Sequence, residues 1–178
     1  LFTSALGGSA ANIAAAICRL GGSASLITTV SDDAVGRFIH NQLVRYEIGT
    51  QYVATAGGEA RSSLAVVETR NEDCQSVIYR NGAADFALTM QNVTGIPYGD
   101  FGALVVTGTS LAMEPSRSAT FHAMALARKA GLPVILDVDH RPYSWANADD
   151  ASVTCLRAGS ISDIVVGNDV EFAVMAGV

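Results

Sequence analysis

The chain has 178 residues, 49% of them hydrophobic, and a formal net charge of −6. This length can bury a substantial core, and an acidic balance without a run of basic residues argues against a nucleic-acid partner. No apolar stretch approaches the roughly 20 residues that span a bilayer, and no basic-then-apolar leader opens the chain, so we expect a soluble, cytoplasmic protein without a membrane partner. Cys18, Cys74 and Cys155 are far apart, which argues against a disulfide scaffold and a zinc site.

Residues 7–20 predict a helix that begins at a glycine turn. Its apolar residues recur at helical spacing: Ile13, Ala14, Ile17 and Leu20. Gly7 and Gly8 leave the backbone open to a ligand beside unpaired first-turn amides, and Asn12 can offer a donor and an acceptor to a hydroxyl group. A plain turn with Ser9 as N-cap explains the same residues, so both interpretations stay open. The glycine pattern of dinucleotide-binding turns and the lysine of a phosphate-binding loop are absent.

A strand and a second helix follow. Residues 25–30 are typical of a buried strand, and Ser-Asp-Asp at 31–33 predicts the start of a packing helix over residues 34–46. Asp33 and Gly36 are explained first by the chemistry of a helix N-terminus.

Between residues 51 and 80 the pattern changes to three short strands, at 52–54, 62–69 and 76–80, with polar turns between them. We expect an antiparallel sheet that stands off the main body, and we call this segment the lid. A small sheet needs another surface to bury its second face, so we expect a homodimer formed through the lid. Tyr79 and Arg80 end the last strand, where Arg80 is either solvated or a donor to a carboxylate or keto sugar beneath the lid.

The remaining chain alternates strands with helices. Strands are predicted at 103–109, 133–138 and 163–167, with a helix over 115–130. This alternation predicts an α/β fold with a doubly wound, mostly parallel sheet. We therefore assign residues 1–50 and 81–178 to an α/β core and residues 51–80 to the lid.

Charged residues are concentrated where the strand at 133–138 ends. Alternation places Asp137, Asp139 and Arg141 on one side, at the edge where open α/β sheets bind ligands. An internal salt bridge, with Trp145 as a cap on the hydrophobic core, is the simpler alternative. The Asp-x-Asp pair of haloacid-dehalogenase-like phosphatases is disfavoured, because His140 follows and the strand is not the first of the sheet.

Asn168 and Glu171 follow the last predicted strand and open a helix. Their spacing fits a capping box.

These motifs together resemble the ribokinase-like (PfkB) carbohydrate kinases. The shared features are Gly-Gly-x-x-x-Asn on a helix that ends in Arg-Leu-Gly, and Val-x-x-Asp-x-x-Gly after the next strand. Ser31 departs from the pattern, since the family usually has glycine there. Residues 137–145 are similar to the Asp-x-Asp-x-Arg-Pro-x-x-Trp segment of the 5-dehydro-2-deoxygluconokinases within this family.

The resemblance implies ATP-dependent phosphorylation of a sugar or sugar-acid hydroxyl, with ATP and Mg²⁺ as cofactors. It implies that the substrate is bound by Gly7, Gly8, Asn12, Tyr79, Arg80, Asp139 and Arg141. Arg141 would also support the transferred phosphate. Asn168 and Glu171 would bind the cofactor, with Glu171 acting on the metal through water. A 2-keto-3-deoxygluconokinase, a fructokinase and a non-catalytic sugar-binding module are the alternatives.

The resemblance also indicates that the sequence is a fragment. A kinase of this type would have a strand before Leu1 and most of its nucleotide site after Val178. The family's Gly-Ala-Gly-Asp, which supplies the catalytic base, does not occur in these residues. We therefore name no catalytic base and expect the fragment alone to be inactive.

Overall fold

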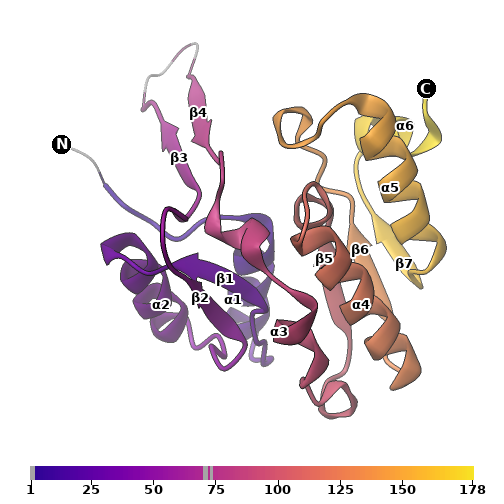
Figure 1. Cartoon of the computed structure of the whole chain (residues 1–178), viewed down its shortest axis with the longest axis horizontal. Coiled ribbons are helices and arrows are strands. Elements are labelled where there is room, and N and C mark those ends of the chain that lie inside the picture. Colours follow the sequence, from indigo (N-terminus) through magenta and orange to yellow (C-terminus); the bar gives the residue numbers. More distant parts are fainter. Residues whose placement is uncertain (1–2, 70–71, 73) are drawn as a thin grey trace.

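In the computed structural model, which describes residues 3–69, 72 and 74–178, the first half of the chain forms a parallel strand pair with two helices (Figure 1). The elements are α1 (Ser9–Arg19), β1 (Thr28–Ser31), α2 (Ala34–Arg45) and β2 (Val53–Ala56). β1 and β2 are parallel, with Thr28 opposite Val53. This pair and its crossover helix α2 form a βαβ unit.

The second helix begins at Ala34, as expected, with Asp33 as its N-cap. The Asp33 carboxylate accepts hydrogen bonds from the amides of Val35 and Gly36, each at 2.9 Å. The Gly36 amide and the Ser31 hydroxyl are the main causes that lower the pKa of Asp33. Glycine is required at position 36, since a Cβ there would lie 1.8 Å from the Ser31 carbonyl oxygen.

The lid is an antiparallel pair of strands, β3 (Leu64–Val67) and β4 (Ser76–Tyr79), which projects from the body (Figure 1). The expected third lid strand was wrong, because residues 53–56 form β2 and pair in parallel with β1. A strand that follows a crossover helix returns beside the strand before that helix, so β2 belongs to the body. The predicted turn at 70–73 lies mostly outside the described residues.

The second half carries a three-stranded parallel sheet in the order β5-β6-β7. Its elements are η1 (Ala84–Ala87), α3 (Met90–Thr94), η2 (Tyr98–Asp100), β5 (Leu104–Thr107), η3 (Gly108–Leu111), α4 (Ser116–Lys129), β6 (Val134–Asp137), η4 (Pro142–Ser144), α5 (Ala148–Ser160), β7 (Ile164–Val166) and α6 (Asp169–Ala176). In the described residues the parallel strands therefore form two hydrogen-bonded sheets, and the carboxyl ends of β5, β6 and β7 meet at one edge.

The larger hydrophobic core lies between this sheet and helices α4 and α5, around Met124, Val134, Leu136 and Val138. Cys155 is fully buried in it, and burial raises the pKa of this thiol to about 11, so the side chain is inert at neutral pH. A smaller cluster joins α1 to α2 through Ala14 and Leu43. Among the described residues, no helix is both long and apolar enough to cross a membrane.

Candidate functional site

The glycine turn before α1 presents open backbone. Gly8 is the N-cap residue, with φ of 96°, a left-handed conformation that favours glycine, and no side chain caps the helix. A Cβ at Gly7 would meet no atom within 4 Å, so the space beside this turn is free. Asn12 is exposed, and its side chain makes no hydrogen bond to the residues that the structure describes. The turn, its first amides and the Asn12 amide are thus available to a ligand.

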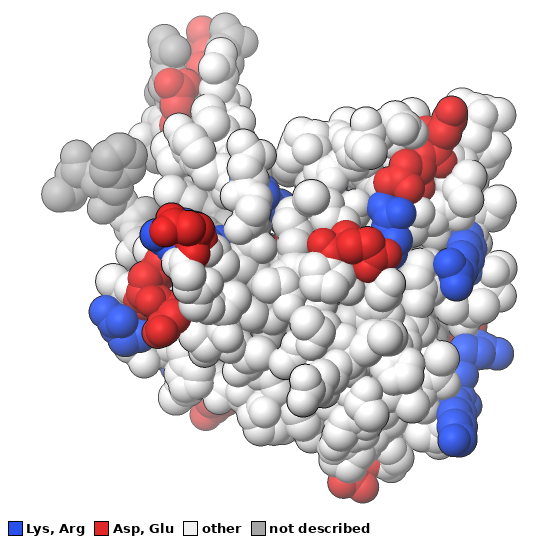
Figure 2. Space-filling view, in the orientation of Figure 1, with Lys and Arg blue, Asp and Glu red and all other residues white. Residues whose placement is uncertain are grey.

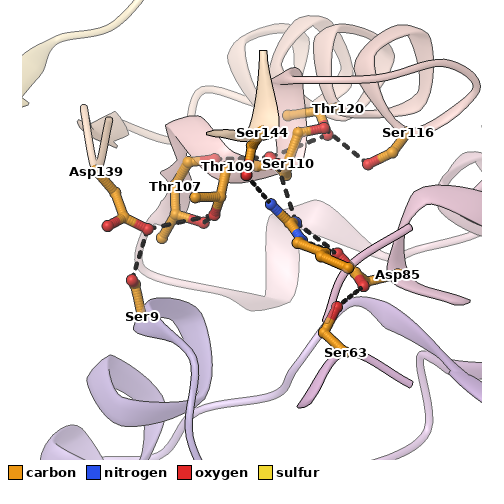
Figure 3. A network of polar contacts seen from close by, with 11 residues as sticks. Ser9, Ser63, Asp85, Thr107, Thr109, Ser110, Ser116, Thr120, Asp139 and Ser144 are labelled. Carbon is orange, nitrogen blue, oxygen red and sulfur yellow. Dashed lines mark hydrogen bonds and ion pairs between the residues drawn. The ribbon is translucent and has the colours of Figure 1, made fainter. Parts of the chain in front are cut away.

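Ser9 does not cap the helix. Its Oγ donates instead to Oδ2 of Asp139, at 2.5 Å and 130 positions further along the chain. Thr109 Oγ1 donates to the same carboxylate oxygen at 3.2 Å, and Figure 3 shows the Ser9 and Thr109 side chains directed at Asp139. The N-terminus of α1 is therefore fixed to the carboxyl edge of the β5-β6-β7 sheet.

Two features of the backbone let Ser9 and Thr109 reach the Asp139 carboxylate. A Cβ at Gly108 would lie 2.0 Å from the carbonyl oxygen of Val138, so only glycine lets η3 approach the end of β6 so closely. Asp139 has φ of 36°, in the left-handed region that non-glycine residues rarely adopt. This turn directs the Asp139 carboxylate toward Ser9 and Thr109, and such conformations concentrate at functional sites.

Arg141 lies on the other side of Asp139. Its Nη2 is 2.7 Å from Asp139 Oδ1, and its side chain is 45% exposed, against 5% for that of Asp139. Nη1 donates to the His140 carbonyl at 3.0 Å and lies 3.8 Å from Glu171 Oε1. The predicted internal ion pair is therefore present, and it leaves part of the Arg141 guanidinium facing solvent.

Asn168 and Glu171 form the capping box that their spacing predicts. Asn168 Oδ1 accepts from the Glu171 amide and Glu171 Oε2 accepts from the Asn168 amide, both at 2.9 Å. Glu171 Oε1 also accepts from the His140 amide at 3.2 Å, which ties α6 to the end of β6. Burial, followed by the negative charges of Asp139 and Glu171, raises the pKa of Asp137 at the same edge.

No group of three or more His, Cys, Asp or Glu side chains in the described part of the chain could hold a metal ion alone. Mg²⁺ commonly takes only one or two protein carboxylates and completes its shell with waters and phosphate oxygens. Glu171 fits such a contact through water, although the residue is only 8% exposed and its carboxylate already accepts two backbone amides.

Arg80 is held by the protein at the base of the lid. Its Nε and Nη2 donate to Asp85 Oδ2 at 3.1 and 2.5 Å, Nη1 donates to Ser144 Oγ at 3.1 Å, and Nη2 donates to the Thr109 carbonyl at 3.1 Å. The guanidinium also lies over the Phe86 ring, 4.1 Å from its centroid. Tyr79, by contrast, is 61% exposed on the lid.

Sequence reasoning missed Asp85 and Ser144 as partners of Arg80, and it treated Ser9 only as a possible N-cap. Arg80 and Asp85 are only five positions apart in the sequence, and this short separation could have indicated their contact. No local pattern connects Ser9 to Asp139, because a contact across the fold depends on the topology of the sheet.

Charged side chains are sparse on the face drawn in Figure 2, where the blue and red atoms form separate small groups over a mostly uncharged surface. The charges of the candidate site are those of the buried Asp139 and Glu171 and of the half-exposed Arg141 at the sheet edge.

Residues 2–178 match the family model described as pfkB family carbohydrate kinase, so the chain belongs to this family of carbohydrate kinases. It is 43% identical over 174 residues to the 5-dehydro-2-deoxygluconokinase of Photobacterium profundum, covering 98% of this chain and 53% of that protein. The chain spans about half the length of the curated relatives it matches.

Solved structures agree with the predicted ribokinase-like fold. The fructokinase of Vibrio cholerae, crystallised with fructose, ADP and calcium ion, has a TM-score of 0.80 and 28% identity and covers 96% of this chain and 55% of that one. The fructokinase of Xylella fastidiosa with bound ATP has a TM-score of 0.81 and 25% identity, over 89% of this chain and 50% of that one.

Proposed function

We propose that a protein of the relatives' length carrying this chain, called the full-length protein below, transfers a phosphoryl group from ATP to a hydroxyl of a sugar acid. The relatives named 5-dehydro-2-deoxygluconokinase, at 38–43% identity over nearly the whole chain, support 5-dehydro-2-deoxygluconate as the first substrate to test. A cytoplasmic location fits a small-molecule kinase.

The observation that carries this proposal is the hydrogen bond from Ser9 to Asp139. It joins an open glycine turn, suited to a polyhydroxyl ligand, to a sheet edge that holds Arg141 and Glu171. Phosphoryl transfer needs a positioned hydroxyl, neutralisation of phosphate charge and a bound metal in one place. The geometry supports a positioned hydroxyl at the glycine turn and neutralisation of phosphate charge by Arg141. It supports a bound metal through Glu171.

In this proposal Gly7, Gly8 and Asn12 bind sugar hydroxyls, and Arg141 supports the substrate acid or the transferred phosphate. Asn168 and Glu171 organise the cofactor end of the site, Glu171 through water. Bound ATP supplies the transferred group, and Mg²⁺ would neutralise its charge. We assign no catalytic base to these 178 residues.

A fructokinase is the second candidate, favoured by the TM-scores of about 0.8 to two fructokinases, one of them crystallised with fructose. A 2-keto-3-deoxygluconokinase and a non-catalytic sugar-binding module remain weaker alternatives. Assays of the full-length protein with ATP and the three sugars, followed by ADP release, separate these functions.

Substitutions at Asn12 and Gly7 test whether the glycine turn before α1, which we call the sugar turn, binds the sugar. In the full-length protein, Asn12→Ala should lose one or two sugar hydrogen bonds and weaken sugar binding by about 1–3 kcal/mol. Gly7→Ala should leave the melting temperature unchanged, since its Cβ meets no protein atom, and should raise the sugar KM. Steady-state kinetics and thermal melts measure both effects, and an unchanged KM in both variants would return this turn to a purely structural role.

The lid supports a homodimer. Leu64 lies opposite Tyr79 and Val66 opposite Val77, so one face of the ribbon carries four apolar side chains, and three of them are more than 48% exposed. A two-stranded ribbon cannot cover such a face itself. We expect a second copy of the chain to cover it.

Val77→Asp in the full-length protein should shift it from dimer to monomer in analytical ultracentrifugation. Val67→Asp is the matched control, because Val67 is 57% exposed on the opposite face of the same ribbon, across from Ser76. A dimer that survives Val77→Asp would argue against this interface.

A further inference from the structure

Asp139 contacts three separate parts of the candidate site. Its Oδ2 accepts from Ser9 at the start of α1 and from Thr109 in η3, and its Oδ1 pairs with Arg141 at the end of β6. With 5% of the residue exposed, the carboxylate has little surface left for a ligand. We therefore expect Asp139 to act indirectly, by holding neighbouring residues that can contact a ligand.

The charges around Asp139 make the pairing with Arg141 important. Asp137 and Glu171 are the other carboxylates close to this edge, and the electrostatic influence of Asp139 on Asp137 is repulsive. Arg141 is 2.7 Å from Asp139 and 3.8 Å from Glu171, so two carboxylates fix the direction of its guanidinium. Without Asp139, Arg141 would keep only the longer contact and the His140 carbonyl.

Through its hydrogen bond with Ser9, Asp139 also fixes the position of the sugar turn, the Gly7–Gly8 turn before α1. Ser9 is the first residue of α1, directly after this turn, and its hydroxyl points across the fold instead of capping the helix. Loss of this hydroxyl would leave the start of α1 without its bond to the sheet edge and the position of the turn less defined.

We propose that Asp139 and Ser9 are positioning residues: one buried carboxylate sets the sugar turn, through Ser9, and Arg141 relative to each other. The proposal rests on the kinase function proposed above. It gives Asp139 a role different from the direct substrate contact expected from the sequence.

The test uses kinetics of the full-length protein with the sugar acid and ATP. Ser9→Ala should raise the sugar KM about tenfold or more with a smaller change in kcat, as expected for one lost hydrogen bond to a charged group, and Ser9→Thr, which keeps the hydroxyl, should restore most of the loss. Asp139→Asn keeps the size of the side chain but removes its charge, and it should lower kcat at least about tenfold, because Arg141 is no longer held. The double variant should lose less than the product of the two single losses, since both act through one contact.

Asp150→Asn is the matched control. Asp150 pairs with Arg117 at 2.7 Å, joins separate elements as Asp139 does, and lies outside the candidate site. It should lower the melting temperature and leave kcat and the sugar KM unchanged. Should Asp139→Asn be too unstable to purify, Ser9→Ala and Ser9→Thr alone decide the matter through the KM and its rescue.

Two failures are distinguishable. A full-length wild type that phosphorylates no sugar would contradict the proposed function, and calorimetric titration with the sugar acid would then still show whether Ser9→Ala weakens binding. An active wild type whose Asp139 and Ser9 variants lose only thermal stability, as Asp150→Asn does, would overturn the positioning role.

Discussion

The 178-residue chain expressed alone should release no ADP in the presence of ATP and a sugar, whereas the full-length protein should turn over. The chain covers 53% of its Photobacterium profundum relative, and we assign it no catalytic base. A positioned base contributes about 10²–10⁴-fold, so the rate of the chain alone should fall below about one hundredth of the full-length rate. A coupled ADP assay at equal protein concentration measures this ratio.

Sugar-dependent ADP release by the chain alone would mean that the base lies within these residues. Asp137 would then be the first residue to substitute, because its pKa is raised and it lies at the carboxyl edge of the sheet. Circular dichroism of the isolated chain is the necessary control, since an unfolded chain would also be inactive.

Arg80→Ala in the full-length protein should lower kcat/KM for 5-dehydro-2-deoxygluconate and for fructose by similar factors, about tenfold or more. The guanidinium uses four hydrogen bonds within the protein and is paired with Asp85, so it offers little net charge to a substrate. Its removal leaves the Asp85 carboxylate unpaired and frees the Thr109 carbonyl, which should cost on the order of 2–3 kcal/mol of stability.

Asp85→Asn is the informative partner for this experiment, because it breaks the same ion pair and leaves Arg80 in place. It should reduce activity toward both sugars in the same way, and Arg80→Lys should rescue only part of the loss, as an ammonium lacks the planar fork. A loss confined to the sugar acid would contradict the structural role. It would support the sequence-based prediction that Arg80 binds the substrate carboxylate.

The glycine turn, the helix start at Asp33 and the strand at 133–138 could all be predicted from the sequence, since each depends on local spacing. The parallel pairing of residues 53–56 with β1 could not be predicted. A short strand of mixed polarity fits an antiparallel ribbon as well as a parallel pair, and only the connection through α2 decides between them. Helix α5 was also missed, although Asn147 caps it and Asp149 and Asp150 lie in its first turn.

For the site, the sequence identified which segments matter but not how they meet. The concentration of charge at 137–141 and the Asn168–Glu171 box were predicted, and the capping alternative was confirmed. The contacts of Asp139 with Ser9 and Thr109 depend on the close approach of Gly108 to Val138, which no spacing rule encodes. Substrate contacts of Gly7, Gly8, Asn12, Tyr79 and Arg141 stay predictions.

The most direct test of the central proposal is the kcat/KM of the full-length protein for 5-dehydro-2-deoxygluconate, measured by ADP release with ATP and Mg²⁺, beside 2-keto-3-deoxygluconate and fructose. We predict sugar-dependent turnover with the highest kcat/KM for 5-dehydro-2-deoxygluconate. A full-length protein that binds sugars without releasing ADP, or that prefers fructose, would contradict the proposal.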